Sequence, residues 1–297
     1  MIRLAVRVRR EQAELVLAEL LELAPGGVEE VAVGESVEYA VYGAPGELPS
    51  LPDLKAAAGA ALVQIATSET PDDWHERWRR FHRPVLIRPP RQSAAAKRSV
   101  PAVCVRPPWE HPAGAPGDAV EEIVIDPGQA FGTGAHASTR QCLELLLSLA
   151  QLEPRLGPLV DLGTGSGVLA IAAARLGFTP VLAIDNDRGS IAAAEANAAA
   201  NGVQVQLRHA DLRTQAAGWT AAAGDDAGSV VVLANLLRPL LLEVARAMPR
   251  APAQLIAGGL LPKQVAGVAS DFAQQLGLHE RERRQGGGWA AVWLSAR

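Results

Sequence analysis

The chain falls into two stretches with different hydrophobic periodicity. Up to about residue 68, "IRLAVRV", "GVEEVAV" and "VEYAVYG" alternate apolar and polar positions, as half-buried strands do. "EQAELVLAELLEL" repeats its apolar positions at helical spacing and stops at "APGG". "LPDLKAAAGA" and "ALVQIATS" predict a short helix and a closing strand. The order strand-helix-strand-strand-helix-strand is typical of a small ferredoxin-like α+β domain.

From about residue 137, short apolar strands alternate with helices. Strands are predicted at 158–162, 180–184, 203–208, 230–234 and 253–258. The tail "LHERERRQGGGWAAVWLSAR" predicts two more strands joined by a glycine turn. This alternation indicates an α/β fold, an open parallel sheet with helices on both faces. Between the two stretches, residues 72–83 carry tryptophans and a phenylalanine at helical spacing, which indicates a packing stripe on a linker helix.

Composition narrows the classes of protein that fit. Hydrophobic residues make up 48% of the 297 residues, enough for a substantial core, yet no apolar run is long enough to span a membrane. The basic N-terminus is not followed by the apolar region of a signal peptide. Cys104 and Cys142 do not form a disulfide framework, and there is no His/Cys cluster to hold a structural metal. We therefore expect a cytoplasmic protein without a metal site.

The stretch "LVDLGTGSGVLAIAAARLG" predicts a nucleoside site at the end of a strand. Gly163, Gly165 and the glycine two residues later allow a tight turn and close approach of a ligand. A dinucleotide fingerprint needs its third glycine where Val168 stands. The carboxylate of Asp161 would repel a pyrophosphate but would accept hydrogen bonds from a cationic amino-acid group. These details favour S-adenosyl-L-methionine over NAD.

Two further strand ends carry candidate binding residues. Asp185 ends the next strand, where a carboxylate can accept hydrogen bonds from both ribose hydroxyls, and Asp187 is expected to cap the following helix. Asn235 ends the fourth strand of the sheet, beside the expected cofactor, where it is a candidate for positioning the acceptor amine. No aromatic residue follows it in "NLLRP", which favours an aliphatic amine over a nucleobase as acceptor. A simple strand-end cap is the alternative role of Asn235.

A second glycine-rich segment, "DPGQAFGTGAHAST", precedes the first strand of the parallel sheet. We expect it to fold over the cofactor, with Phe131 against the sulfonium end, where cation–π attraction is available, and with Gly132 as a further cofactor contact. Thr139 is expected to open the next helix and to offer its hydroxyl to the ligand. His136 is either a catalytic base or a residue that shapes the loop, and the second role is favoured.

These motifs resemble those of a known family, the PrmA-type methyltransferases that modify large-subunit ribosomal protein L-eleven. The resemblance rests on the two glycine-rich segments with "AIDND", "ANLLRPL" and "LIAGGLLPKQ", and the chain departs from the pattern where "GGGW" lacks an acidic residue before the tryptophan. It implies a class I (Rossmann-like) methyltransferase that acts on lysine side chains and an N-terminal amine. It also implies a substrate-recognition domain over 1–68, a linker helix and hairpin over 69–112, and a catalytic domain over 113–297. By position, the cofactor contacts would be Thr139, Gly163, Asp185 and Asn235.

Charge distinguishes the possible substrates. Residues 1–68 hold five basic and ten acidic side chains, a balance that suits a basic partner such as a ribosomal protein and opposes RNA binding. The linker is basic because it carries four arginines: Arg77, Arg79, Arg80 and Arg83. These arginines form either a solvated helix face or a contact with ribosomal RNA. The alternatives to a protein-amine methyltransferase are an RNA methyltransferase and a nucleoside-binding protein without methyl-transfer activity.

Overall fold

The chain forms two compact units. The computed structural model describes residues 2–24, 28–43, 48–69, 82–90, 96–113, 119–127, 134, 136–215 and 229–296. The described part of the first unit ends at residue 69 and that of the second begins at residue 82. The predicted aromatic stripe of the linker helix lies outside the described residues, as do Arg77, Arg79 and Arg80.

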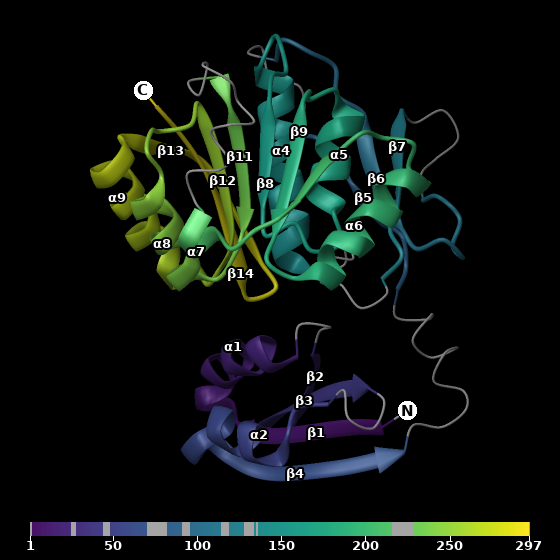
Figure 1. Cartoon of the computed structure of the whole chain (residues 1–297), viewed down its shortest axis with the longest axis vertical. Coiled ribbons are helices and arrows are strands. Elements are labelled where there is room, and N and C mark those ends of the chain that lie inside the picture. Colours follow the sequence, from purple (N-terminus) through teal and green to yellow (C-terminus); the bar gives the residue numbers. More distant parts are fainter. Residues whose placement is uncertain are drawn as a thin grey trace. The chain divides into compact units, whose positions relative to one another are not determined.

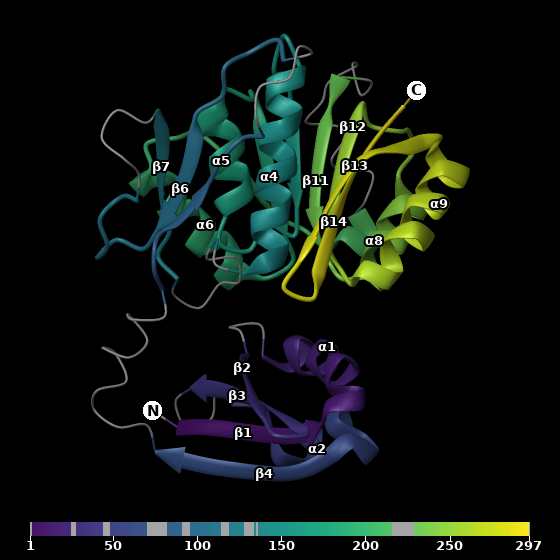
Figure 2. The same cartoon turned by 180° about the vertical axis from the view of Figure 1, so that it is seen from behind.

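The first unit has the predicted ferredoxin-like topology. An antiparallel sheet in the order β2-β3-β1-β4 carries two helices, as Figures 1 and 2 show. Its elements, in chain order, are β1 (Ile2–Arg9), α1 (Ala13–Leu23), β2 (Glu29–Val33), β3 (Ser36–Gly43), α2 (Leu51–Ala58) and β4 (Leu62–Glu69). The pattern of alternating apolar residues therefore predicted both the elements and their order.

This unit has its own hydrophobic core between the sheet and the helices. Leu4, Val6 and Val8 alternate along β1 and pack with Leu20 of α1 and Leu54 of α2. Tyr39 of β3 lies on the same face and is buried, and its hydroxyl donates a hydrogen bond to the carbonyl of Ala13 over 2.9 Å. A separate core allows this unit to fold independently of the rest of the chain.

The opposite face of the same sheet carries a network of ion pairs. Glu38 of β3 accepts hydrogen bonds from Arg3 and Arg7 of β1, each over 2.7 Å. Hydrogen bonds from Arg3 and then Arg7 hold the pKa of Glu38 below its usual value. Arg3 also lies 3.9 Å from Glu29 of β2. The cationic groups on this face are therefore partly neutralised by carboxylates of their own sheet.

The second unit begins with a three-stranded sheet in the order β5-β6-β7. The strands are β5 (Val85–Ile87), β6 (Ala102–Arg106) and β7 (Val120–Val124). β5 and β6 are antiparallel, and β6 and β7 are parallel. The predicted boundary between residues 112 and 113 thus falls between two paired strands, and the described residues from His82 onward belong with the second unit.

The main sheet of this unit has seven strands in the order β10-β9-β8-β11-β12-β14-β13 (Figure 1). The first five are parallel and β14 is antiparallel to both neighbours. The strands are β8 (Leu159–Leu162), β9 (Val181–Asp185), β10 (Gln206–His209), β11 (Val231–Asn235), β12 (Gln254–Leu260), β13 (Leu278–Gly286) and β14 (Trp289–Ala296). Strand order reverses between β8 and β11, the place where open α/β sheets bind ligands.

Helices cover both faces of this sheet, as predicted. They are α4 (Ala137–Leu152), α5 (Val168–Leu176), α6 (Arg188–Ala200), α7 (Leu212–Gln215), α8 (Arg238–Ala247) and α9 (Val265–Leu276). One core contains residues of α4, α5 and α6, and the other contains residues of α7, α8 and α9. Successive residues of a strand point alternately into these two cores. Residues two positions apart on a strand therefore face the same helices.

Two details differ from the expected elements. The helix expected to open at Thr139 begins two residues earlier, at Ala137, because His136 serves as its N-cap. β10 begins at Gln206 instead of residue 203, so the third strand is shorter than its apolar run. Asp187 caps α6 as predicted, because its carboxylate accepts a hydrogen bond from the Ser190 N–H over 2.8 Å.

One edge of the seven-stranded sheet is formed by β13, whose exposed residues are mostly charged. Arg284 forms ion pairs with Glu282 of the same strand and Glu144 of α4, and Arg283 pairs with Glu280. The charges of "HERERR" thus lie along a sheet edge, where a hydrophobic strand would be exposed to other chains.

Candidate functional site

The predicted polar residues at three strand ends face the same side of the main sheet. Asp185, Asp161 and Asn235 lie at the carboxyl ends of β9, β8 and β11, which are neighbours in the sheet. On each strand, the residue two positions earlier belongs to the core beneath α4 and α5: Ala183, Leu159 and Leu233. Because side chains alternate along a strand, all three polar groups project toward these helices.

The turn after β8 depends on its glycines. Gly163, Gly165 and Gly167 have φ angles of 72°, 54° and 84°, a region that side chains rarely adopt. A Cβ on Gly163 would lie 2.3 Å from Cδ2 of Leu236, so this turn also packs closely against the residue after Asn235. The N–H groups of Gly163 and Thr164 donate to the carbonyl of Ile184, which fixes the turn to β9.

Asp185 holds this turn from the neighbouring strand. Its Oδ2 accepts a hydrogen bond from the Gly165 N–H over 2.9 Å, and its Oδ1 accepts one from the Asp187 N–H over 3.0 Å. A carboxylate oxygen has two lone pairs, so each oxygen can still accept one further hydrogen bond. The carboxylate therefore combines a structural role with the capacity to bind a pair of hydroxyls.

Asp161 is buried and only half satisfied. Its Oδ2 accepts a hydrogen bond from the Thr164 hydroxyl over 2.6 Å, while its Oδ1 has no hydrogen-bond partner among the described residues. Burial raises the pKa of Asp161 to about 7. The Thr164 hydrogen bond and the nearby N–H of Ala170 oppose the rise, and the charge of Asp185 adds to it. A buried acceptor of this kind is suited to a cationic donor.

Asn235 contacts the start of α4. Its Nδ2 donates to the Thr139 hydroxyl over 3.4 Å, and its Oδ1 is buried without a hydrogen-bond partner in the described part of the chain. The next strand has a glycine here because a Cβ on Gly258 would lie 2.9 Å from that oxygen and 2.3 Å from Sγ of Cys142. Burial, and then the charge of Asp161, raises the pKa of the Cys142 thiol, so a nucleophilic thiolate is disfavoured.

His136 lies at the N-terminus of α4 as its cap. Its Nδ1 accepts a hydrogen bond from the Ser138 N–H over 3.3 Å and lies 2.8 Å from the Ser138 hydroxyl. Burial lowers the pKa of His136, which favours the neutral ring that a cap requires. These contacts fit the structural role expected for His136. Phe131 and Gly132, the two predicted lid contacts, lie outside the described residues.

Two buried amides that the sequence analysis missed connect the parts of this site. Asn197 of α6 donates to the carbonyl of Ser166 and accepts from the N–H of Asp126, which joins the turn after β8 to the beginning of the other glycine-rich segment. Gln141 of α4 donates to the carbonyls of Gly286 and Trp289 in the β13–β14 turn. Both amides lie on helices without a recognisable motif. The sequence offered one signal, which concerns the partner of Gln141: Trp289 lies an even number of positions from the buried Trp293 of β14 and so shares its face.

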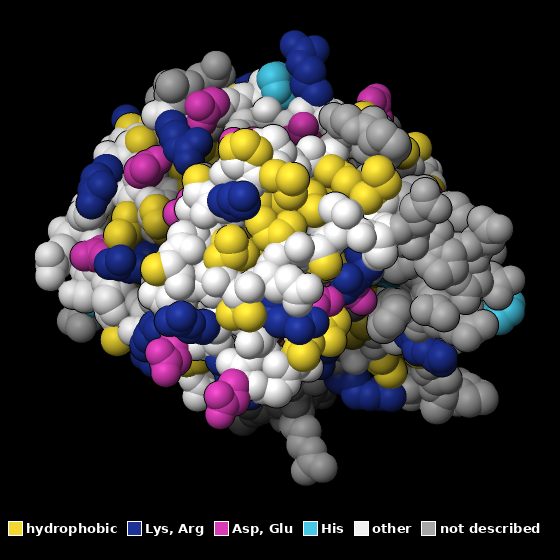
Figure 3. All heavy atoms as spheres, turned by 90° about the horizontal axis from the view of Figure 1, so that it is seen from below, with side chains coloured by type: hydrophobic (Ala, Val, Ile, Leu, Met, Phe, Trp, Pro, Cys, Tyr) yellow, Lys and Arg dark blue, Asp and Glu magenta, His cyan; other side chains and the backbone are white. Residues whose placement is uncertain are grey.

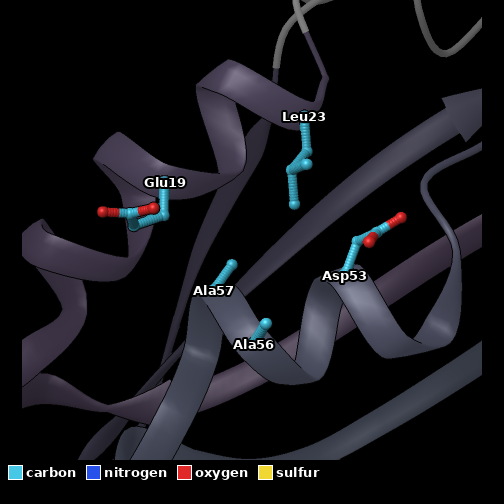
Figure 4. A pocket seen from close by; sticks show the side chains of 5 residues that line it. All are labelled: Glu19, Leu23, Asp53, Ala56 and Ala57. Carbon is cyan, nitrogen blue, oxygen red and sulfur yellow. The ribbon is translucent and has the colours of Figure 1, made fainter.

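A hollow lies in the first unit, between α1 and α2 (Figure 4). The side chains of Glu19 and Leu23 line it from α1, and those of Asp53, Ala56 and Ala57 line it from α2. It combines apolar groups with two carboxylates and contains none of the predicted cofactor residues.

Neither a metal site nor a membrane-spanning helix is found among the described residues. No three or more His, Cys, Asp or Glu side chains there form a group that could hold a metal ion. None of the described helices is both long and apolar enough to cross a bilayer.

Comparisons with known proteins give consistent results. The family model described as "Ribosomal protein L11 methyltransferase (PrmA)" matches residues 53–297. A ribosomal protein L11 methyltransferase of Pelotomaculum thermopropionicum is 34% identical over 241 residues, which cover 79% of this chain and 69% of that protein. One of Geobacter sulfurreducens is 36% identical over 229 residues, covering 75% and 67%.

A solved structure agrees with the sequence matches. The crystal structure of a ribosomal protein L11 methylase from Lactobacillus delbrueckii subsp. bulgaricus aligns with a TM-score of 0.51 and 28% identity. The alignment covers 66% of this chain and 94% of that one.

Proposed function

The chain belongs to the ribosomal protein L11 methyltransferase (PrmA) family, and we propose that it methylates amino groups of a basic ribosomal protein with S-adenosyl-L-methionine. The acceptors would be lysine side chains, an N-terminal amine, or both. Such a substrate implies that the protein acts in the cytoplasm.

The row of acceptors at the switch point of the sheet carries this proposal. Asp185 has remaining lone pairs for the ribose hydroxyls, and the turn from Gly163 to Gly167 offers a backbone without side chains at three of its five positions. The unpaired Oδ1 of Asp161 is suited to the ammonium of the amino-acid end. The donor groups of this cofactor therefore match acceptors of the site, whereas a pyrophosphate would meet two carboxylates.

The acceptor end requires positioning more than activation. When bound, the cofactor supplies a methyl group already activated by its sulfonium, so the protein has to place a neutral amine in line with it. The unpaired Oδ1 of Asn235 can accept a hydrogen bond from the amine N–H and so direct its lone pair. A protonated lysine must lose its proton before attack, and removal from water favours the neutral form.

The first unit fits a role in substrate recognition. Its 1–68 segment carries twice as many acidic as basic residues, and a ribosomal protein offers the opposite charge. Large hydrophobic side chains that are 36–51% exposed are found here: Leu23, Val31, Val33, Leu51 and Val63. Figure 3 shows hydrophobic side chains gathered on one face beside charged ones. Exposed apolar groups with charged neighbours are typical of a protein-binding surface.

An RNA substrate fits less well. An RNA-binding sheet of this topology stacks bases on exposed aromatic side chains. Here Tyr39 faces the helices instead, and Arg3 and Arg7 on the open face are paired with Glu38. Tyr39, Arg3 and Arg7 are therefore not available to stack on bases or to pair with phosphates.

Transfer of label tests the proposal. The protein would be incubated with methyl-labelled S-adenosyl-L-methionine, separated ribosomal proteins and ribosomal RNA, and we expect label on one basic large-subunit protein. Label in RNA alone would overturn the proposal, and absence of label with intact cofactor binding would favour a nucleoside-binding protein. A variant that lacks residues 1–69 should still bind S-adenosylhomocysteine but should not methylate the protein.

A further inference from the structure

The turn between β13 and β14 is fixed to α4 by a side chain in which only one orientation is possible. Gln141 is 5% exposed, and its Nε2 donates to the carbonyls of Gly286 and Trp289, each over 2.9 Å. Only the amide nitrogen can face two carbonyl oxygens, so the amide cannot be reversed. The turn itself has left-handed φ angles of 59° at Gly287 and 81° at Gly288. Gln141 therefore determines where β14 begins.

Two further contacts hold the first residue of β14 against the start of α4. The rings of Trp289 and His136 meet edge to face, with centroids 5.0 Å apart and planes at 63°. A Cβ added to Gly287 would lie 3.0 Å from Cβ of Ala137, so the turn packs directly on the first helical residue. Trp289 is thus held at its backbone carbonyl by Gln141 and at its ring by His136, and the turn before it packs on α4.

The position of Trp289 in the sheet places it beside the acceptor end of the site. Ala291 and Trp293 of β14 belong to the core beneath α4, and Trp289 shares their face by alternation. β14 runs antiparallel to β12, with Ala290 opposite Leu260, so Trp289 lies at the sheet edge where β11 and β12 end. β12 contributes Gly258 beside Asn235. Trp289 is therefore the next large side chain on this face beyond Asn235.

We propose that Trp289 forms the wall of the acceptor site, that it selects an alkyl amine, and that Gln141 is the residue that positions it. This inference rests on the proposed function. The half-buried indole offers an apolar surface for the methylene groups of a lysine stem and a π face for the cationic product. Trp289 comes from a different strand than the position after Asn235, which carries no aromatic residue.

Kinetic parameters for the two substrates test the role of Trp289. In Trp289→Ala the KM for the ribosomal protein should rise by about threefold to fifteenfold, the range expected when one or two methylene groups of the lysine stem lose their apolar contact. The Kd of S-adenosylhomocysteine should remain within a factor of two. Trp289→Phe, which keeps a π face, should restore most of the loss. An unchanged protein KM in Trp289→Ala, or an equal loss of cofactor affinity, would refute the proposal.

The positioning role of Gln141 has its own test. Gln141→Met removes both donated hydrogen bonds at similar volume and should raise the protein KM in the same direction as Trp289→Ala, but less. The matched control is Gln151→Met, because Gln151 is also buried on α4 and donates to the carbonyl of Pro90 over 3.2 Å. That variant should leave the protein KM unchanged.

A double variant shows whether Gln141 affects the KM through Trp289 or independently of it. Gln141→Met added to Trp289→Ala should cause no further rise in KM, because the two residues act as a unit. A further rise equal to that of Gln141→Met alone would refute the positioning role. These outcomes differ from failure of the proposed function, in which the wild-type protein itself would transfer no label to a ribosomal protein.

Discussion

The N–H of Gly165 donates to Oδ2 of Asp185 over 2.9 Å, so the carboxylate that ends β9 also fixes the glycine turn that follows β8. The second oxygen of Asp185 accepts the N–H of Asp187 and so fixes the entry to α6. One side chain thus connects two neighbouring strand ends, and its loss would disturb the turn as well as any bound ribose.

Asp185→Ala should weaken cofactor binding strongly. Hydrogen bonds to a charged group contribute about 1.5–3 kcal/mol, so the Kd of S-adenosylhomocysteine should rise roughly tenfold to a hundredfold. Calorimetric titration measures this value. Asp187→Ala is the matched control, because it removes a helix cap and should lower stability by about 1 kcal/mol with little effect on affinity. An unaltered Kd in Asp185→Ala would mean that the ribose binds elsewhere.

Asp161 should make the cofactor-free protein less stable as the pH rises. Its pKa is about 7 in the folded protein against a usual 3.8, so between these values the folded state holds a proton that the unfolded chain has lost. The favourable contribution of protonated Asp161 to the free energy of unfolding is complete below pH 3.8 and is lost as the pH rises to about 7. Asp161→Asn should remove this dependence.

Urea unfolding of the cofactor-free protein measures the effect. At about pH 8, Asp161→Asn should be more stable than the wild type by on the order of a few kcal/mol, and at about pH 4 the difference should nearly vanish. Asp271→Asn, on the partly exposed face of α9, serves as the control. A stability difference that does not change with pH would contradict the raised pKa.

Binding of a ligand whose ammonium lies beside Asp161 should release a proton from this carboxyl group. An ammonium near the carboxylate favours its ionised form, so S-adenosylhomocysteine should bind more tightly as the pH rises toward about 7. Calorimetry near pH 6 in two buffers with different ionisation enthalpies gives the number of protons released. The Asp161→Asn variant should release fewer, and equal release by both proteins would place the ammonium away from Asp161.

Gly163→Ala should damage the site as well as the fold. The left-handed conformation at φ 72° costs a residue with a side chain about 1–2 kcal/mol, and the new Cβ would displace Leu236, the neighbour of Asn235. Gly177→Ala is the control, since Gly177 has φ 103° with open space around its Cβ position. Both variants should lower Tm, but only Gly163→Ala should weaken cofactor binding. Equal affinities would exclude close approach at Gly163.

The hollow of the first unit provides a test of substrate recognition. Glu19→Lys should raise the KM for a basic ribosomal protein by roughly twofold to tenfold at low salt, and the effect should shrink as ionic strength rises. Glu30→Lys, an equally exposed change on β2, should have a smaller effect. Identical effects of the two variants would indicate a general influence of net charge instead of binding in the hollow.

The fold was predictable because its elements are local. Alternation in β1 and helical spacing in α1 each depend on neighbouring residues, and the glycines after β8 mark a turn without any knowledge of the rest of the chain. Asp185 and Asn235 could be selected as strand-end residues for the same reason.

The contacts that complete the site depend on distant parts of the chain. Gln141 meets the carbonyl of Trp289 across 148 positions of sequence, and no local pattern marks either residue as a partner of the other. The cap of α4 was missed because histidine is an uncommon N-cap, and its role depends on the Ser138 N–H. The shared face of Asp161 and Asn235 requires the observed pairing of β8 with β11.

The charged edge strand β13 has a consequence for the behaviour of the protein in a crowded cell. An unpaired strand edge offers its N–H and C=O groups to any extended chain nearby, and nascent or unassembled ribosomal proteins supply such chains. The paired charges of Glu280, Glu282 and Arg284 would have to be stripped of water by an added strand. The sheet can therefore end at β13 without adding a strand from another polypeptide.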